Sequence, residues 1–258
     1  MIPKIIHYCW FGGNPLSELT IKCIESWKKF CPDYEIIEWN ERNFNINYNQ
    51  YCKEAYNAKK FAFVSDVARL KALCEMGGIY LDTDVEIIKP LDDFLKLKAF
   101  GGFENMRDIG TAVMACEKNH PLFQEFFNVY KGKKFINEDG TQNIIANVTY
   151  LTEICTKYGF VANNKKQNVN EFVIFPKEYF SPKDYDVEKI IITDNSHTIH
   201  HFNFSWYTKE QEKRHKKAVF FRNKFGRKFG EYIFLATEIP SKIKEYGFKD
   251  AMKRMIKR

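Results

Sequence analysis

Two aspartates one residue apart, Asp82 and Asp84, follow a short apolar segment in the run GGIYLDTDVEI. In an extended or turn conformation their side chains leave the same face of the chain, so both carboxylates can reach one ligand. Neighbouring carboxylates repel each other unless a cation lies near them, and hard oxygen ligands favour Mg²⁺ or Mn²⁺ with phosphate oxygens completing the shell. The pair, with Thr83 between its members, predicts a metal-assisted clamp for a diphosphate leaving group.

The surroundings of the pair decide between this clamp and an ordinary acidic surface turn. A bare pair of aspartates is common on protein surfaces. Here Tyr80 and Leu81 are apolar and a glycine pair precedes them, so the carboxylates emerge at the end of a buried strand. Ligands collect at the carboxyl ends of strands in doubly wound sheets, which favours the clamp.

A second pair of polar residues lies in the preceding helical segment, where Asp66 and Arg69 are three residues apart and share a face. At a surface the two would pair with each other, which stabilises a helix by only a few tenths of a kcal/mol. Alternatively both bind a ligand: an aspartate accepts a hydrogen bond from a sugar or ribose hydroxyl, and an arginine fork binds phosphate. Only Gly77 and Gly78 separate this helix from the next strand. We therefore expect Asp66 and Arg69 to lie near the aspartates.

Two adjacent histidines, His200 and His201, lie in the segment TIHHFNFSW. A histidine among aromatic residues is most often structural, but one of these two could complete a metal shell. In a strand the two rings point to opposite faces, so at most one is expected to be a ligand.

The hydrophobic pattern predicts the elements that hold these residues. The first part of the chain alternates strands and helices, which is typical of a parallel sheet covered by helices. Its expected strands cover residues 4–11, 34–39 and 79–81, and its helices 17–30 and 62–76. Further expected strands cover 100–103, 111–116, 172–175, 189–193 and 198–202, with helices after 121 and over 142–158. A helical tail of some fifty residues ends the chain.

The composition is that of a globular enzyme. The chain has 258 residues, 45% hydrophobic and 28% charged, which suits one enzyme-sized domain. No apolar run is long enough to span a membrane and the start does not resemble a signal peptide, so we expect a cytoplasmic protein. Its seven cysteines are scattered and odd in number, which predicts small core residues instead of disulfides or a zinc site.

The charge is unevenly distributed and suggests a boundary near residue 208. Residues 209–258 carry sixteen Lys or Arg and six Asp or Glu, whereas residues 1–208 carry 24 and 27. We therefore expect a main domain over 1–208 and a basic helical extension over 209–258. The extension could lie on an anionic membrane surface, or it could be a solvated charged helix. Nucleic acid is a weaker alternative, because no nucleic-acid-binding motif is present.

Three segments together resemble the family 32 glycosyltransferases of the capsular polysaccharide type, which are related to the glucosyltransferase domains of large clostridial toxins. The segments are IPKIIHYCWFGG, FAFVSDVARLKALCEMGGIYLDTDVEIIKPLD and HHFNFSW. The resemblance implies a GT-A fold: an α/β nucleotide-binding sandwich with a mainly parallel central sheet. It also implies transfer of a hexose with retention of anomeric configuration, from a UDP- or GDP-sugar, with Mn²⁺ or Mg²⁺ as cofactor.

The resemblance also assigns roles to individual residues. Asp84 is expected to ligate the metal directly, with Asp82 contacting the metal shell or the ribose. Asp66 would bind donor hydroxyls and Arg69 the sugar and phosphate, so that Asp84, Asp66 and Arg69 form the catalytic group. Trp10 would stack on the nucleotide base, although a core tryptophan is an equal alternative.

The last matched segment supplies the remaining expected contacts. His201 precedes Trp206 by five residues, the offset of a metal-binding side chain in related enzymes, and is therefore preferred to His200. Ser205 and Trp206 would contact the diphosphate as a lid closes.

The expected function is hexose transfer to a glycan or lipid-linked acceptor in surface polysaccharide synthesis, from the cytoplasmic side of the membrane. The alternatives are a metal-dependent phosphohydrolase of the haloacid dehalogenase type and a non-catalytic module that binds glycans or a membrane surface. The segment 103–189, where sugar and acceptor should bind, offers few matches. Glu104, Asn105 and Asp108 could be sugar contacts or ordinary loop residues.

Overall fold

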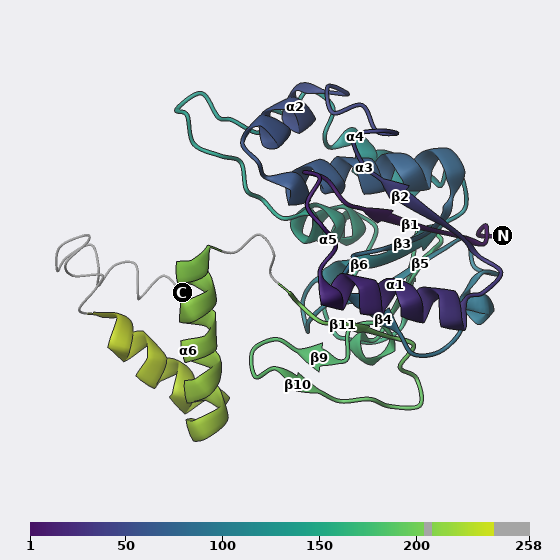
Figure 1. Cartoon of the computed structure of the whole chain (residues 1–258). Coiled ribbons are helices and arrows are strands. Elements are labelled where there is room, and N and C mark those ends of the chain that lie inside the picture. Colours follow the sequence, from purple (N-terminus) through teal and green to yellow (C-terminus); the bar gives the residue numbers. More distant parts are fainter. Residues whose placement is uncertain (204–207, 240–258) are drawn as a thin grey trace. The chain divides into compact units, whose positions relative to one another are not determined.

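A computed structural model describes residues 1–203 and 208–239 of the chain (Figure 1). The chain divides into two compact units, each with its own internal contacts. The first unit comprises residues 1–183 and 191–203, and the described part of the second comprises 184–190 and 208–239. The domain boundary predicted at residue 208 stays a prediction.

The first unit begins with the expected alternation of strands and helices. Strand β1 lies between β2 and β3 and is parallel to both. Ser17 caps the first helix by accepting a hydrogen bond from the Thr20 N–H. The elements are β1 (Ile5–Cys9), α1 (Glu18–Phe30), β2 (Glu35–Trp39), α2 (Gln50–Asn57), α3 (Phe61–Met76) and β3 (Gly78–Leu81).

The central sheet has seven strands in the order β2-β1-β3-β6-β5-β8-β7. Five strands run in one direction, while β6 and β7 run antiparallel to their neighbours. The predicted fold class, an α/β sandwich with a mainly parallel sheet, is confirmed. The remaining elements here are β5 (Ala99–Phe103), β6 (Ile109–Cys116), α4 (Pro121–Asn128), α5 (Asn147–Lys157), β7 (Gln167–Val169) and β8 (Phe172–Phe175), with 3₁₀ turns η1 (Asp92–Phe94) and η2 (Lys177–Tyr179).

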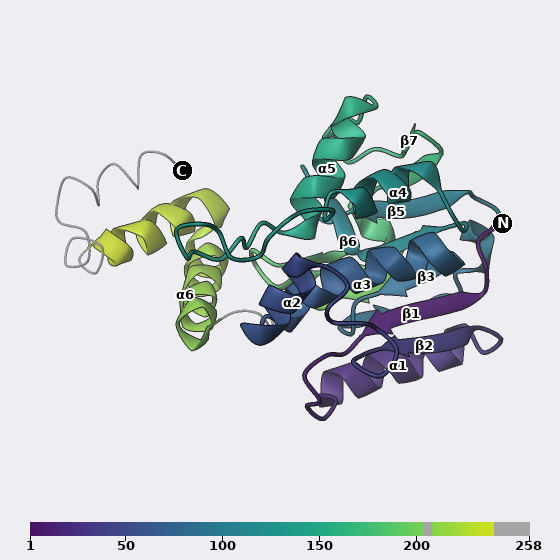
Figure 2. The ribbon, with the colours of Figure 1, turned by 90° about the horizontal axis from the view of Figure 1, so that it is seen from above.

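Helices cover both faces of the sheet. Alternate residues of each strand point to opposite faces, so both faces carry apolar side chains that need to be buried. In β3, Tyr80 faces the core under α2, α3, α4 and α5, whereas Ile79 and Leu81 face the core that Trp27 of α1 completes. Figure 2 shows α3, α4 and α5 on one side of the strands. Both faces of β3 are thus buried, so only its carboxyl end is open to a ligand.

The turn after α3 requires glycine. Gly77 ends the helix with φ +71°, and Gly78 follows with φ +109°. A Cβ on Gly78 would lie 2.8 Å from the carbonyl oxygen of Ile5 in the neighbouring strand. The glycine pair thus turns the chain abruptly from α3 into β3 and lets β3 lie close against β1.

A second, two-stranded sheet pairs β4 (Val85–Ile87) antiparallel with β11 (Thr198–His200). Strand β4 directly follows the aspartate pair, and His200 lies opposite Val85. The sequence analysis did not identify β4, because three residues are too few to show a period. This pairing brings two segments more than a hundred residues apart in sequence to one place.

The second unit is helical and basic, as predicted for the described part of the tail. Helix α6 (Lys209–Phe225) begins with a capping box formed by Thr208 and Gln211 and ends at Gly226. A second helix follows over 227–239. Arg222 pairs with Glu231, and Arg214 pairs with Glu238, so ion pairs join the two helices. A short hairpin of β9 (Lys183–Asp184) and β10 (Lys189–Ile190) precedes them.

Several predicted boundaries differ from the structure. The strand expected over 189–193 is reduced to the two residues of β10, and the helix expected from residue 142 begins at Asn147. The short helix α2 and strand β7 were not predicted. All seven cysteines are buried and free, as expected. Among the described residues, none of the helices has the length and apolar character needed to cross a bilayer.

Candidate active site

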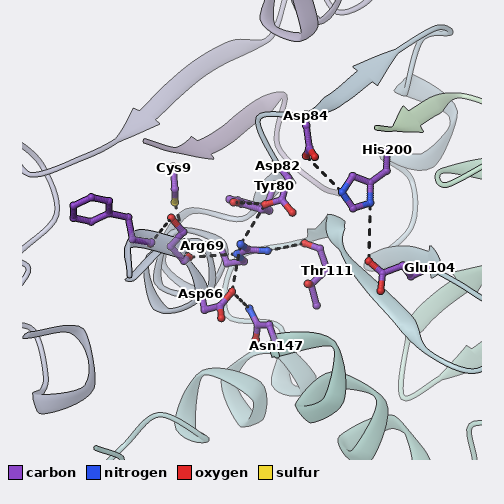
Figure 3. Close-up of polar contacts among 12 residues, drawn as sticks. Cys9, Asp66, Arg69, Tyr80, Asp82, Asp84, Glu104, Thr111, Asn147 and His200 are labelled. Atoms are coloured by element: carbon purple, nitrogen blue, oxygen red, sulfur yellow. Dashed lines mark hydrogen bonds and ion pairs between the residues drawn. The ribbon is translucent and has the colours of Figure 1, made fainter. Parts of the chain in front are cut away.

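The aspartate pair lies at the carboxyl end of β3, in a tight turn that leads into β4. The Asp82 N–H donates to the carbonyl of Ala112 in β6 (2.9 Å), and the Val85 N–H donates back to the carbonyl of Asp82 (2.9 Å). These bonds fix the turn at both ends. Thr83, between the aspartates, is partly exposed. Figure 3 shows both carboxylates beside the ring of His200.

Asp82, Asp84 and His200 form a three-residue cluster that could hold a metal ion. Each offers one ligand atom, and these atoms all lie within 4.8 Å of one another. His200 Nε2 lies 3.5 Å from Asp84 Oδ1. Two carboxylate oxygens and one imidazole nitrogen suit a divalent ion such as Mn²⁺ and leave coordination positions for phosphate oxygens. The donor set therefore fits the predicted metal.

The charges within this cluster are mutually dependent. Burial acts to raise the pKa of Asp84, but the charge of His200 and the Asn203 N–H outweigh it and hold the pKa at about 2. Burial acts to lower the pKa of His200, but the charge of Asp84 outweighs it and the pKa is raised. Asp84 and His200 thus stabilise each other's charged form.

Arg69 forms a buried network beneath Asp82. Its Nη2 lies 3.3 Å from Asp66 Oδ1 and 3.2 Å from Asp82 Oδ1, and its side chain is only 7% exposed. Its Nη1 donates to the carbonyl of Thr111 (3.1 Å) and its Nε to the carbonyl of Ser65 (3.3 Å). All three guanidinium nitrogens therefore have partners within the protein (Figure 3).

Two further side chains complete the network. The Tyr80 hydroxyl donates to Asp82 Oδ1 (2.8 Å), and the guanidinium of Arg69 lies over the Tyr80 ring at 4.4 Å. Asn147 donates to Asp66 Oδ1 (3.0 Å). Burial raises the pKa of Asp66 to about 6, although the charge of Arg69 opposes this rise. Asp66 and Arg69 thus pair as a buried unit that also fixes Asp82.

Trp10 lies at the carboxyl end of β1, where it lines a cavity of about 380 Å³. Its indole Nε1 donates to the carbonyl of Asn14 (2.6 Å), which holds the ring at the rim of the cavity. The other lining residues are Gly13, Asn14, Pro15, Leu16, Glu38, Asn40, Glu41 and Arg42. The ring is partly buried and borders this cavity, and its contact with a nucleotide base stays a prediction.

The structure brings His200, and not the preferred His201, to the aspartates. His201 follows β11 directly, and its Nε2 lies 2.9 Å from Glu86 Oε2 in β4. The preference for His201 as the metal ligand is thus corrected in favour of His200. Ser205 and Trp206, the two expected lid residues, lie outside the described residues.

Glu104 is a part of the site that the sequence analysis left open. It follows β5, and its Oε1 lies 4.0 Å from His200 Nδ1. Burial raises the pKa of Glu104, although the charge of His200 opposes this. Asn105 and Asp108 instead hydrogen-bond to each other in the turn after β5. The contacts of Thr111, Asn147 and Asn203 were not predicted, since no local pattern marks residues whose partners lie 42 to 119 positions away.

Comparison with known proteins assigns the family. The family described as "Glycosyltransferase sugar-binding region containing DXD motif" matches residues 17–100, which include the aspartate pair. An uncharacterized glycosyltransferase of Acanthamoeba polyphaga mimivirus is 30% identical over 240 residues, covering 87% of this chain and 90% of the relative. The chain belongs to this glycosyltransferase family. It is therefore a transferase by descent, and the phosphohydrolase alternative has no support.

Other similarities are partial. Inositol phosphoceramide mannosyltransferase 3 of Schizosaccharomyces pombe is 33% identical over 129 residues, which cover 47% of this glycosyltransferase and 35% of the relative. Among solved structures, the PaToxG glycosyltransferase shares 20% identity at a TM-score of 0.47, covering 60% of this chain and 68% of that one.

Proposed function

We propose that this glycosyltransferase is a metal-dependent, retaining hexosyltransferase of the family 32 type. Its donor would be a UDP- or GDP-hexose, and its acceptor a glycan or lipid-linked saccharide in surface polysaccharide synthesis. The observation that carries the proposal is the convergence of Asp82, Asp84 and His200 at the carboxyl end of β3.

The donor would lie along the carboxyl edge of the sheet. Strands β1 and β3 are neighbours, and each ends at one half of the proposed site: Trp10 and its cavity follow β1, and the aspartates follow β3. Adjacent strands are about 4.8 Å apart, so a nucleoside in the cavity can extend its diphosphate toward the aspartates. This arrangement agrees with binding at the strand ends of an open α/β sheet.

Chemically, a metal bound at this cluster would stabilise negative charge on the departing nucleoside diphosphate. The chain supplies the geometry: Arg69 and Tyr80 fix Asp82, while His200 and the Asn203 N–H fix Asp84. Retention of configuration is assigned from the family resemblance. Two routes give retention: a double displacement, which needs a nucleophilic carboxylate, and a front-face reaction, in which the leaving phosphate accepts the proton of the acceptor hydroxyl and no enzyme base is required.

Mannose and a lipid-linked acceptor are the first substrates to test. The names of two Schizosaccharomyces pombe relatives, inositol phosphoceramide mannosyltransferases 1 and 3, describe mannose transfer to a lipid. This chain spans 35% and 52% of these relatives, so their substrates enter here only as a proposal.

The second unit is proposed to bind an anionic membrane at its cytoplasmic face. Its described helices expose four aromatic side chains: Phe220, Phe225, Phe229 and Tyr232, the last two 62% and 70% exposed. Lysines accompany them, and Lys224 lies over the rings of Phe220 and Phe225. Exposed aromatic residues among basic ones favour the interface of an anionic bilayer.

The donor is tested by thermal shift and donor hydrolysis with UDP- and GDP-hexoses, in Mn²⁺, in Mg²⁺ and in chelator. We expect one nucleotide sugar to stabilise the protein only when a metal is present. An NMR spectrum of the product would then report its anomeric configuration. Folded protein that responds to no nucleotide sugar would contradict the proposal.

Membrane binding is tested by co-sedimentation of the full chain with anionic and neutral vesicles. We expect binding to anionic vesicles, with a marked loss in the variant F220S/F229S/Y232S. Transfer to a soluble acceptor should be unchanged in this variant. Equal sedimentation of the variant and the natural chain would contradict a role for these aromatic residues.

A further inference from the structure

The imidazole ring of His200 lies between two carboxylates that face its two nitrogens. Nε2 is 3.5 Å from Asp84 Oδ1, and Nδ1 is 4.0 Å from Glu104 Oε1 (Figure 3). The side chain is only 9% exposed, and Nδ1 is buried without a hydrogen-bond partner among the described residues. One nitrogen therefore faces Asp84, and the other faces Glu104.

A histidine binds a metal through a nitrogen that carries no proton, so its other nitrogen must carry the proton of the neutral ring. In metal sites that N–H is usually donated to a carboxylate or carbonyl, which fixes the tautomer and the ring orientation. For His200 the nitrogen on the aspartate side is Nε2. Nδ1 must then carry the proton, and the acceptor that it faces is Glu104.

Glu104 is held in place by the turn that follows β5. Its N–H donates to the carbonyl of Asp108 (2.9 Å), and the Arg107 and Asp108 N–H groups donate to Asn105 Oδ1 (2.7 and 3.0 Å). A Cβ on Gly110 would lie 3.1 Å from the Cβ of Glu104, so the absence of a side chain there lets the turn close around it. A movement of about 1 Å by the carboxylate would bring it within hydrogen-bond distance of Nδ1.

We propose that Glu104 is a positioning residue for His200: it accepts the Nδ1–H and so presents Nε2 to the ion between Asp82 and Asp84. The proposal rests on the metal site of the proposed function. It deepens that function because it assigns a task to a carboxylate that is not one of the three residues that could hold the metal.

The chain contains a matched control for this arrangement. Glu86 lies 2.9 Å from the neighbouring histidine, His201, and also pairs with Lys22. Glu86 and Glu104 each place a carboxylate beside a histidine, and their side chains are about equally exposed. Only the histidine next to Glu104 faces the aspartates. Glu86→Gln therefore controls for the loss of a carboxylate beside a histidine.

The first experiment needs no metal. In ¹⁵N NMR spectra of the full chain, recorded at a pH high enough that the His200 ring shows the chemical shifts of a neutral imidazole, His200 should be protonated at Nδ1. Glu104→Leu should shift His200 toward the Nε2–H tautomer or a mixture. Glu104→Gln, whose amide oxygen can still accept, should retain much of the Nδ1–H form. An Nε2–H tautomer in the natural chain, or an identical tautomer in Glu104→Leu, would overturn the proposal.

The second experiment is titration of the full chain with Mn²⁺ by calorimetry. Glu104→Leu should weaken binding by about tenfold to a hundredfold, the usual effect of removing such a partner. Glu104→Gln should weaken it less, and Glu86→Gln by less than about twofold. Unchanged affinity in both Glu104 variants, or an equal loss in Glu86→Gln, would overturn the positioning role.

The two proposals fail in different ways. If the natural chain binds no divalent ion, the metal-dependent function is wrong, whereas the tautomer result still reports on Glu104 and His200. If the natural chain binds Mn²⁺ and the Glu104 variants bind equally well, only the positioning role is wrong. Circular dichroism of each variant verifies that it is folded.

Discussion

The two carboxylates of the Asp82-Thr83-Asp84 turn lie in different surroundings. Asp82 forms an ion pair with Arg69 and accepts a hydrogen bond from Tyr80, and both partners belong to a buried network that includes residues of α3. Asp84 has the Asn203 N–H and the ring of His200 as partners, both supplied by the distant segment around β11. Asp82 is held by Arg69, which is always protonated, whereas Asp84 faces His200, whose ring can lose its proton.

This difference separates two tasks within one motif. Arg69 remains charged at every accessible pH, so Asp82 has a fixed partner and a fixed orientation. His200 can release its proton and offer a lone pair, so the Asp84 side can exchange a proton for a metal ion. We infer that the Asp82 side determines stability, while the Asp84 side determines metal binding. The following predictions test that division.

The largest effect is expected from Asp84→Asn. Loss of the carboxylate should remove metal-dependent stabilisation by the donor and lower transfer by more than about a thousandfold. The protein should remain folded by circular dichroism. The control is Asp93→Asn at an exposed position in η1, with transfer close to that of the natural chain. More than a tenth of normal transfer in Asp84→Asn would contradict the assignment.

Arg69→Met should mainly affect stability. It leaves the carboxylates of Asp66 and Asp82 without their buried cation, and breaking a buried pair typically costs about 3 to 5 kcal/mol. Urea unfolding would measure the loss. The exposed Arg107 is the control, and Arg107→Met should change the free energy of unfolding by less than about 0.5 kcal/mol. An equal free energy of unfolding in the two variants would contradict the inference that the Asp82 side of the site determines stability.

Asp66→Asn should change the pH dependence of stability. Because burial raises the folded-state pKa of Asp66 to about 6, the folded protein binds a proton more tightly than the unfolded chain does. Asp66 therefore makes stability fall as pH rises from about 4 to about 6, by up to about 3 kcal/mol. The amide of the variant does not titrate, so this fall should be absent from Asp66→Asn. Unfolding curves at several pH values would measure it, and parallel pH profiles for both proteins would contradict the prediction.

The smallest effect separates the two histidines. His200→Gln should weaken Mn²⁺ binding by about a hundredfold, because it removes the nitrogen that faces the aspartates. His201→Gln should change the affinity by less than about threefold, since His201 faces Glu86. Calorimetric titration of both variants gives the answer. The opposite order would restore the preference for His201 that the family resemblance implies.

Much of the fold was predictable because its signals are local. Helix α3 and strand β3 lie close to their expected ranges. Their signals are an apolar pattern and a glycine pair, which involve only residues close together in the sequence. Strands β4, β7 and β10 were missed or overextended. Each has two or three residues, and such short strands are stabilised by their partners instead of by their own pattern.

The sequence by itself determined which residues could do chemistry: the aspartate pair, the Asp66 and Arg69 pair on one helix face, and a histidine pair of which only one member could serve. Tertiary structure alone decided the rest. The antiparallel register of β4 with β11 selected His200, and the neighbouring position of β5 brought Glu104 to its other nitrogen. Strand alternation predicts that the two histidine rings point apart, but only the pairing between distant segments decides which ring lies beside the aspartates.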